Sequence, residues 1–246
     1  MRKEEYPKEL FHLIIQYAIK RAEISKIPLI EIIKNHTPIY YLIGNDSWEF
    51  DKDSIYWKEF LERHNRGEDL EEVAYDMYIK YLPKESKHKW FGCFRYKFVE
   101  NEKGEGIVKM HFLNDRTSKE GPLASSQISK RRSELKELFE DVKEKHPTAK
   151  YVQGGSWLYN FESYKRLFPK EYLKDMKLVP PKPQILTIWG QFINSEWGIK
   201  KEKAEEYLSK LKKAKTEKDL ENIFEYTELS PKCEIAHFYH LFSIPS

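Results

Sequence analysis

The stretch WFGCFRYKFVE (90–100), together with GIVKMHFLN (106–114), decides the fold of this chain of 246 residues. In both runs aromatic and aliphatic residues alternate with polar ones, which is the pattern of half-buried strands. The polar residues 101–105 between the runs include Gly104 and are typical of a hairpin loop. We therefore expect two adjacent antiparallel strands, which place a β-sheet at the centre of the chain.

Helical spacing follows the hairpin. Apolar residues recur at intervals of three and four, which predicts one long helix from about residue 126 to His146-Pro147; they are Ile128, Leu135, Leu138, Phe139 and Val142. After this helix we expect a short strand at 149–153 and a short helix ending near Phe168. A strand at 185–193 and a helix at 200–214 follow. The sequence thus predicts an α+β domain with a mixed, mainly antiparallel central sheet flanked by helices.

The first 85 residues are expected to be mostly helical. Apolar residues recur at helical spacing over 10–18, 55–61 and 70–78. The β-branched and aromatic run 39–43, after Pro38, favours a strand. We expect a helical N-terminal segment over 1–85 and an α+β domain over 86–246, and one continuous domain over 1–246 is the alternative.

Composition excludes several classes of protein. With 43 Lys and Arg against 40 Asp and Glu, the net charge is only +3, and aromatic residues make up 15% of the chain. No run approaches the about 18 uninterrupted apolar residues of a membrane span, so we expect none. Two cysteines form no disulfide framework, which favours a reducing cytoplasm. The ten glycines include neither a phosphate-binding loop nor a dinucleotide fingerprint.

A family resemblance appears in the middle of the chain. The order strand, loop, amphipathic helix and strand, followed by Tyr164-Lys165-Arg166-Leu167-Phe168, resembles the second half of the GNAT family of acyl-CoA-dependent N-acyltransferases. The resemblance covers 90–168 and implies a GNAT-like sheet. It further implies acetyl-CoA or another acyl-CoA as the acyl donor, and a small amine or a protein amine as the acceptor. In that family two strands diverge, and the first of them, here 107–114, offers backbone N–H groups to the thioester carbonyl.

The resemblance also implies roles for individual residues. Tyr164 matches the tyrosine that protonates the departing thiolate, and His111 or Asp115 would take the proton of the acceptor amine. The pyrophosphate would bind at the loop and the helix start, where amides and cationic side chains attract anions. The residues assigned to this binding are Arg116, Gly121, Ser125, Ser126, Arg131, Arg132 and Asn160.

Simpler interpretations stand beside these roles. Tyr164 fits an amphipathic core tyrosine, and His111 fits a half-buried strand residue. If the long helix begins at Pro122, Arg131 and Arg132 lie in later turns, where Glu134 or Glu137 would pair with them.

Other patterns carry weaker signals. Gly154-Gly155-Ser156 lacks the spacing of a nucleophile elbow, and Cys233, His237 and His240 lack a fourth ligand, so we expect no metal site.

A non-catalytic ligand- or RNA-binding module is the second hypothesis. Rings and cations alternate over 89–97, as they do in proteins that bind single strands. We expect those rings to face the core and the chain to bind a small-molecule substrate, not nucleic acid. The oligomeric state is left open.

Overall fold

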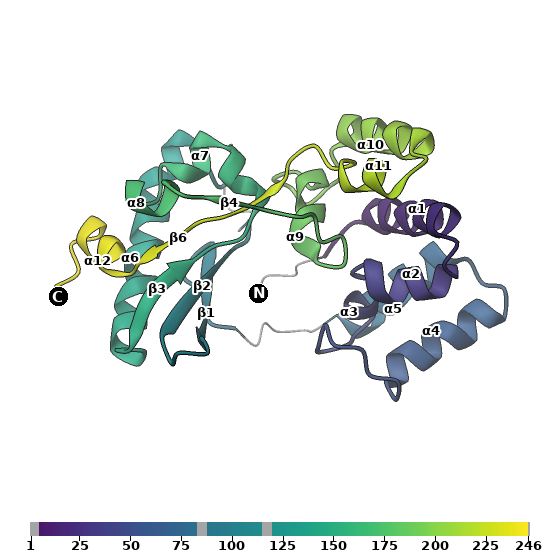
Figure 1. Ribbon diagram of the computed structural model, residues 1–246, viewed down its shortest axis with the longest axis horizontal. Coiled ribbons are helices and arrows are strands. Elements are labelled where there is room, and N and C mark those ends of the chain that lie inside the picture. The colour runs from purple at the N-terminus through teal and green to yellow at the C-terminus, as the bar shows by residue number, and fades with distance from the viewer. Residues whose placement is uncertain (1–4, 83–87, 115–119, 246) are drawn as a thin grey trace. The chain divides into compact units, whose positions relative to one another are not determined.

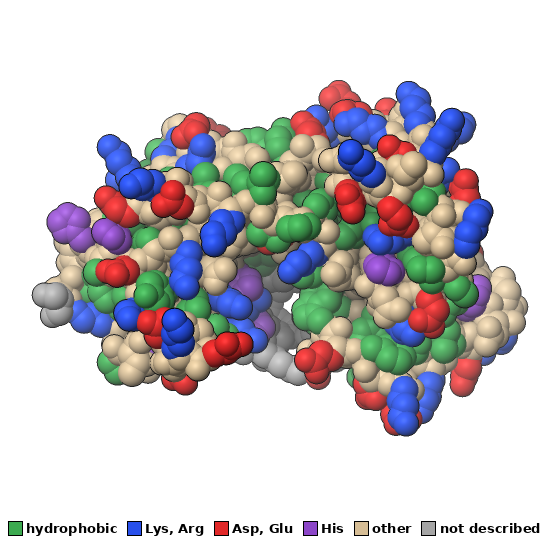
Figure 2. Space-filling model, in the orientation of Figure 1, with side chains coloured by type: hydrophobic (Ala, Val, Ile, Leu, Met, Phe, Trp, Pro, Cys, Tyr) green, Lys and Arg blue, Asp and Glu red, His purple; other side chains and the backbone are tan. Residues whose placement is uncertain are grey.

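The computed structural model describes residues 5–82, 88–114 and 120–245. The chain divides into two compact units. Unit 1 comprises Met1–Glu85 and Pro181–Glu225, and unit 2 comprises Ser86–Pro180 and Tyr226–Ser246. The second segment of unit 1 had been expected to continue the α+β domain. On the face shown in Figure 2, side chains of both charges are interspersed over both units.

The regular secondary structure of unit 1 is helical within its described residues, apart from an isolated antiparallel bridge between Ile193 and Ile199. Its elements are α1 (Lys8–Ser25), α2 (Leu29–His36), α3 (Ile39–Leu42), α4 (Ile55–Asn65), α5 (Leu70–Tyr81), α9 (Leu186–Trp189), the 3-10 turn η3 (Gly190–Phe192), α10 (Lys201–Lys213) and α11 (Glu217–Glu221). Side-chain caps fix three of the starts. Ser54 accepts the Trp57 N–H, Asp69 accepts two N–H groups of α5, and Thr216 forms a capping box.

Two expected strands of unit 1 are wrong. Residues 39–43 form α3, and 185–193 form α9 and η3. Short apolar runs fit a buried strand and a buried helix equally well, so periodicity alone does not separate them. Pro38 directly before α3 fits the start of a helix.

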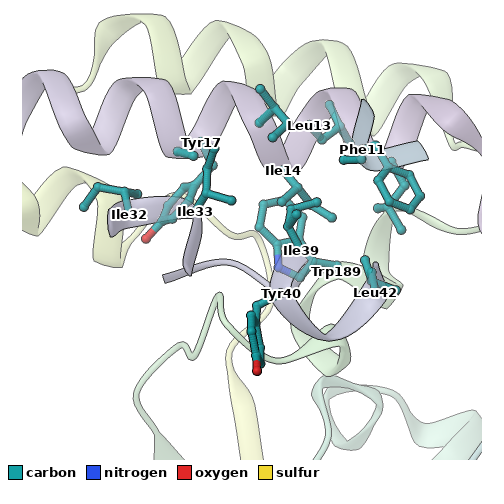
Figure 3. Packing of buried hydrophobic residues seen from close by; sticks show 14 of the residues in the cluster. Phe11, Leu13, Ile14, Tyr17, Ile32, Ile33, Ile39, Tyr40, Leu42 and Trp189 are labelled. Carbon is teal, nitrogen blue, oxygen red and sulfur yellow. The ribbon is translucent and has the colours of Figure 1, made fainter. Parts of the chain in front are cut away.

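The core of unit 1 joins its two chain segments. Figure 3 shows side chains of α1 pointing toward α2 and α3, with Trp189 of α9 among them. Trp189 is fully buried, and its Nε1 donates to the Pro183 carbonyl at 2.7 Å. Its ring makes edge contacts with Tyr17 at 5.9 Å and with Phe224 at 5.2 Å. The late segment is therefore part of this core.

Unit 2 contains the sheets. The central sheet has the order β1-β2-β3-β6, from β1 (Phe94–Glu100), β2 (Gly106–Phe112), β3 (Ala149–Gln153) and β6 (Lys232–Glu234). A second sheet pairs β4 (Lys177–Val179) with β5 (Glu228–Ser230). The helical elements are η1 (Ser125–Gln127), α6 (Ile128–Lys145), η2 (Trp157–Asn160), α7 (Glu162–Lys165), α8 (Lys170–Leu173) and α12 (Ala236–Leu241).

The central sheet is mixed, and this confirms the α+β class. β1–β2 and β3–β6 are antiparallel, whereas β2–β3 is parallel. In Figure 1, β6 lies beside β3 although the two are far apart in the sequence. The first strand begins at Phe94 and not at Trp90, because Phe91 and Phe94 close a tight turn around Gly92, whose φ is +57°.

One face of the central sheet packs on helices. Phe94, Val108 and Val152 are fully buried there, against Leu138 and Phe139 of α6. The expected alternation in the hairpin is thus confirmed for this face. No helix within the described residues is both long and apolar enough to cross a membrane.

Candidate functional site

The parallel pair β2–β3 comes apart toward the carboxyl ends of its strands. Its last paired residues are Lys109 and Gln153. The ladder to β1 continues farther, since the Leu113 N–H donates to the Cys93 carbonyl at 2.8 Å. We call residues 110–114 and 154–156, where β2 and β3 are no longer paired with each other, the strand opening.

The far side of the strand opening is held by the second sheet. The Gly154 N–H donates to Pro231, and Ser156 exchanges two hydrogen bonds of 3.1 Å with Leu229. Each strand therefore keeps its outer neighbour beyond the point where β2 and β3 stop pairing.

Two backbone N–H groups face the strand opening. Alternate residues of a ladder turn toward the same neighbour, and Leu113 bonds to β1, so Phe112 turns away from β1. Gly154 and Ser156 bond to the other side, so Gly155 turns toward β2. Within the described residues, the Gly155 N–H has no backbone acceptor, and the Phe112 N–H makes no backbone hydrogen bond outside the strand ladders. Two such donors can stabilise charge on a carbonyl oxygen placed between them.

Tyr164 lies beneath the strand opening on the helical face. α7 carries it, and its ring meets the Phe112 ring edge-on at 5.4 Å. The side chain is buried, with Tyr159 at 5.0 Å and Phe168 at 4.9 Å. Burial raises the pKa of Tyr164 well above 10, and Tyr159 adds to this. The hydroxyl therefore keeps its proton at neutral pH, as a proton donor requires.

Arg166, two residues after Tyr164, holds the loop before α6. Its Nη2 donates to the Leu123 carbonyl at 2.6 Å, and its Nη1 donates to Ser125 Oγ at 3.2 Å. Its buried Nε has no partner among the described residues. Tyr164 thus contacts the strand opening, and Arg166, two residues later, contacts the loop at the start of α6.

The loop residues assigned to pyrophosphate binding surround that contact. Gly121 is buried with φ +89°, and Ser125 and Ser126 are exposed in η1. Ser126 Oγ donates to the Glu120 carboxylate, so one acidic group already lies near the helix start. Arg132 is exposed, and its Nη2 donates to the Arg166 carbonyl at 3.3 Å.

Arg131 lies elsewhere. It is 1% exposed and pairs with the buried Glu134 at 2.9 Å, while Glu134 accepts the Cys93 N–H at 2.9 Å. A Cβ on Gly92 would lie 1.7 Å from the Glu134 carboxyl carbon, so only glycine fits there. This cluster anchors the turn before β1 to α6, and Arg131 is not open to a ligand.

Asn160 has a local role in the structure. Its Nδ2 donates to the Trp157 carbonyl at 2.7 Å and to the Thr227 carbonyl at 2.9 Å. These bonds tie η2 to the strand that returns as β5. Asp115 and Arg116, the remaining predicted site residues, lie outside the described residues.

His111 lies on the other face of β2 from Tyr164. Its neighbour Phe112 contacts Tyr164, and successive side chains of a strand point to opposite faces. The imidazole is exposed, beside Arg95 on β1. Reduced hydration and, to a smaller extent, the charges of Arg95, His88, Lys97 and Lys109 together lower the pKa of His111 from 6.5 to about 4.

We expect His111 to stay neutral down to about pH 4. The pKa of His111 is lower in the folded chain than in the unfolded chain, so between pH 4 and 6.5 the unfolded chain binds more protons. The free energy of unfolding therefore falls as the pH drops from 6.5 toward 4. An NMR titration of the His111 ring protons measures the pKa directly. His111→Asn should remove this part of the acid sensitivity, and a midpoint at or above 6.5 would contradict the assignment.

Sequence reasoning missed the groups that face the strand opening. The Phe112 and Gly155 amides depend on where β2 and β3 stop pairing, and no residue pattern marks that point. Arg166 lies within the run that resembles the GNAT family, but the resemblance implies no binding role for it. Arg131 carried a usable signal, because it lies four residues before Leu135 on the buried stripe of α6.

Comparisons with protein-family models, with curated protein sequences and with solved structures gave no match to this chain. The described residues contain no group of three His, Cys, Asp or Glu side chains able to hold a metal ion.

Proposed function

We propose that unit 2 is an acyl-CoA-dependent N-acyltransferase with its site at the strand opening. The observation that carries the proposal is the pair of N–H groups, Phe112 and Gly155, that face the space where β2 and β3 separate. A thioester carbonyl between them would accept both hydrogen bonds, and these bonds strengthen as negative charge grows on its oxygen.

The phosphates of the donor would bind at the loop before α6. Ser125 and Ser126 are exposed there, and Arg132 and Arg166 supply positive charge. The amides at the start of α6 add to this attraction for an anion. Arg131 and Asn160 take no part in this arrangement, because both are committed to contacts within the fold.

The reaction balances with the groups present. The acceptor nitrogen attacks the thioester carbon, the C–N bond forms and the C–S bond breaks. Tyr164 gives its proton to the departing thiolate, and the amine proton passes to neutral His111 or to water. Solvent then returns a proton to the Tyr164 oxygen and removes the one held by His111, which restores the starting state. Tyr164 and His111 lie on opposite faces of the sheet, so a substrate meets both only where the strands are apart.

A thiol-release assay with acetyl-CoA and a panel of amines tests the proposal. Tyr164→Phe should lower kcat about a hundredfold with little change in KM, because only proton transfer is lost. Arg166→Gln should instead raise KM for acetyl-CoA about tenfold, as expected for one charged contact. Tyr239→Phe, a tyrosine of α12 packed elsewhere in unit 2, is the matched control.

Two results would contradict this function. One is the absence of both CoA binding by calorimetry and thiol release with every amine tested. The other is an equal loss of binding and turnover in Tyr164→Phe, which would make Tyr164 a packing residue only.

A further inference from the structure

The face of the central sheet opposite α6 is basic. Alternation and strand register place ten side chains on this face: Arg95, Lys97, Val99, Ile107, Lys109, His111, Tyr151, Gln153, Lys232 and Glu234. Four of the ten are Lys or Arg, and one is acidic. We call this set the basic face. Figure 2 shows Lys and Arg side chains over the strands of this sheet.

Like charges lie directly opposite each other on the basic face. Lys97 faces Lys109, and both carry a positive charge at neutral pH. The register continues the lysine row across the sheet through Gln153 to Lys232. Opposed like charges destabilise a sheet. Lys97, Lys109 and Lys232 are exposed, and none forms an ion pair within the described residues. A polyanion laid across the row would relieve this repulsion.

Aromatic rings lie among the cations. The Lys232 ammonium is 4.4 Å from the centre of the Tyr151 ring, and the Arg95 guanidinium is 5.5 Å from that of Trp90. Tyr151 is half-buried at the middle of the sheet, and the Lys150 ammonium lies 5.5 Å from the centre of the same ring. Rings beside cations are the groups on which unpaired bases stack.

We infer that the basic face binds single-stranded nucleic acid. The lysine row contacts backbone phosphates, and Tyr151 supplies a stacking surface for a base. The lysine row runs across four adjacent strands, which lie about 4.8 Å apart, so it extends over roughly 14 Å and reaches more than one phosphate of an extended strand. The inference does not depend on the proposed acyl transfer, which uses the strand opening.

The chemistry of the basic face favours single strands over other polyanions. A duplex hides its base faces and is read by elements that project into a groove, whereas this surface is a sheet face. An acidic protein would satisfy the lysines but would gain nothing specific from the rings. Duplex DNA and poly-glutamate are therefore competitors in the test.

Fluorescence anisotropy with labelled uridine and thymidine oligonucleotides measures the binding. The full chain should bind both, with affinity falling as salt rises between about 50 and 200 mM. Lys97→Gln/Lys109→Gln should weaken binding about tenfold and reduce the salt slope by about 1.4, since each lost phosphate contact removes about 0.7. The two oligonucleotides show whether RNA or DNA is preferred.

The matched control is Lys212→Gln/Lys213→Gln on the exposed side of α10. It removes the same charge elsewhere and should leave both affinity and salt slope unchanged. Equal weakening by the two double variants would overturn the inference, as would no binding at low salt. Tighter binding of duplex or poly-glutamate would overturn it as well. Thermal melts of both variants show whether they fold.

Ring variants separate stacking from charge. Tyr151→Leu should weaken oligonucleotide binding roughly tenfold, whereas Tyr151→Phe keeps the ring and should bind as the parent does. If Tyr151→Leu bound the oligonucleotides as tightly as the parent chain, Tyr151 would have no stacking role. The acetyl-CoA assay on Tyr151→Leu should show unchanged turnover, so failure of either proposal is read independently.

Discussion

Arg131→Met should destabilise unit 2 by about 3–5 kcal/mol, the usual effect of removing one partner of a buried ion pair. Arg131 is 1% exposed and pairs with Glu134 at 2.9 Å. Methionine fills similar space but leaves the Glu134 carboxylate buried without this counter-charge. The same carboxylate accepts the Cys93 N–H, so its displacement also loosens the turn that starts β1. Guanidinium unfolding followed by circular dichroism measures the change.

The double variant Arg131→Met/Glu134→Gln distinguishes charge from packing. The glutamine oxygen can still accept the Cys93 N–H, and no buried charge remains, so most of the lost stability should return. Lys136→Met, at an exposed position of the same helix, should change stability by less than about 0.5 kcal/mol. A single variant as stable as this control, or a double variant worse than the single, would contradict the account.

Trp189→Ala should destabilise unit 1 by about 3–5 kcal/mol, the range for removing a large buried aromatic side chain. The indole is fully buried between α1 and the segment that follows Pro181. The alanine variant also loses the hydrogen bond from the indole Nε1 to the Pro183 carbonyl. The expected result is a large drop in the denaturation midpoint of the helical signal. Trp189→Phe keeps part of the packing and should lose less than half as much.

Trp48→Ala is the control for an exposed indole. Trp48 is 47% exposed and stacks on Tyr41 at 4.1 Å, so its loss should change stability by less than about 1 kcal/mol. If Trp189→Ala were no worse than Trp48→Ala, the segment 181–225 would not be part of the unit 1 core.

The hairpin, the long helix and the strand after it could be predicted because their periodicity extends over enough residues. Alternation fixes which side chains of β1 share a face, and the stripe from Leu135 to Val142 fixes the buried side of α6. The runs 39–43 and 185–193 are too short for this, and tertiary packing around Trp189 decided their conformation. The assignment of 181–225 to unit 1 depends on contacts distant in sequence, which no local pattern reveals.

The candidate site was less predictable than the fold. Tyr164 and the loop residues could be selected by resemblance, but their surroundings could not. Arg131 and Arg132 are adjacent in sequence, yet one is buried in an ion pair and the other is exposed, because a helix turns about 100° per residue. The basic face required the register of all four strands, since Lys232 meets Gln153 only in the folded sheet.

The chain leaves unit 1 near residue 85, returns to it at Pro181 and leaves again after Glu225. During synthesis the first helices therefore emerge from the ribosome before α9, α10 and α11. Their apolar surface stays incompletely buried until most of the remaining chain has been made. In the same way, β3 has no partner on one edge until β6, its antiparallel neighbour, has been synthesised. Fragments cut at either boundary would each lack part of a core, so neither unit can be isolated as one continuous piece of polypeptide.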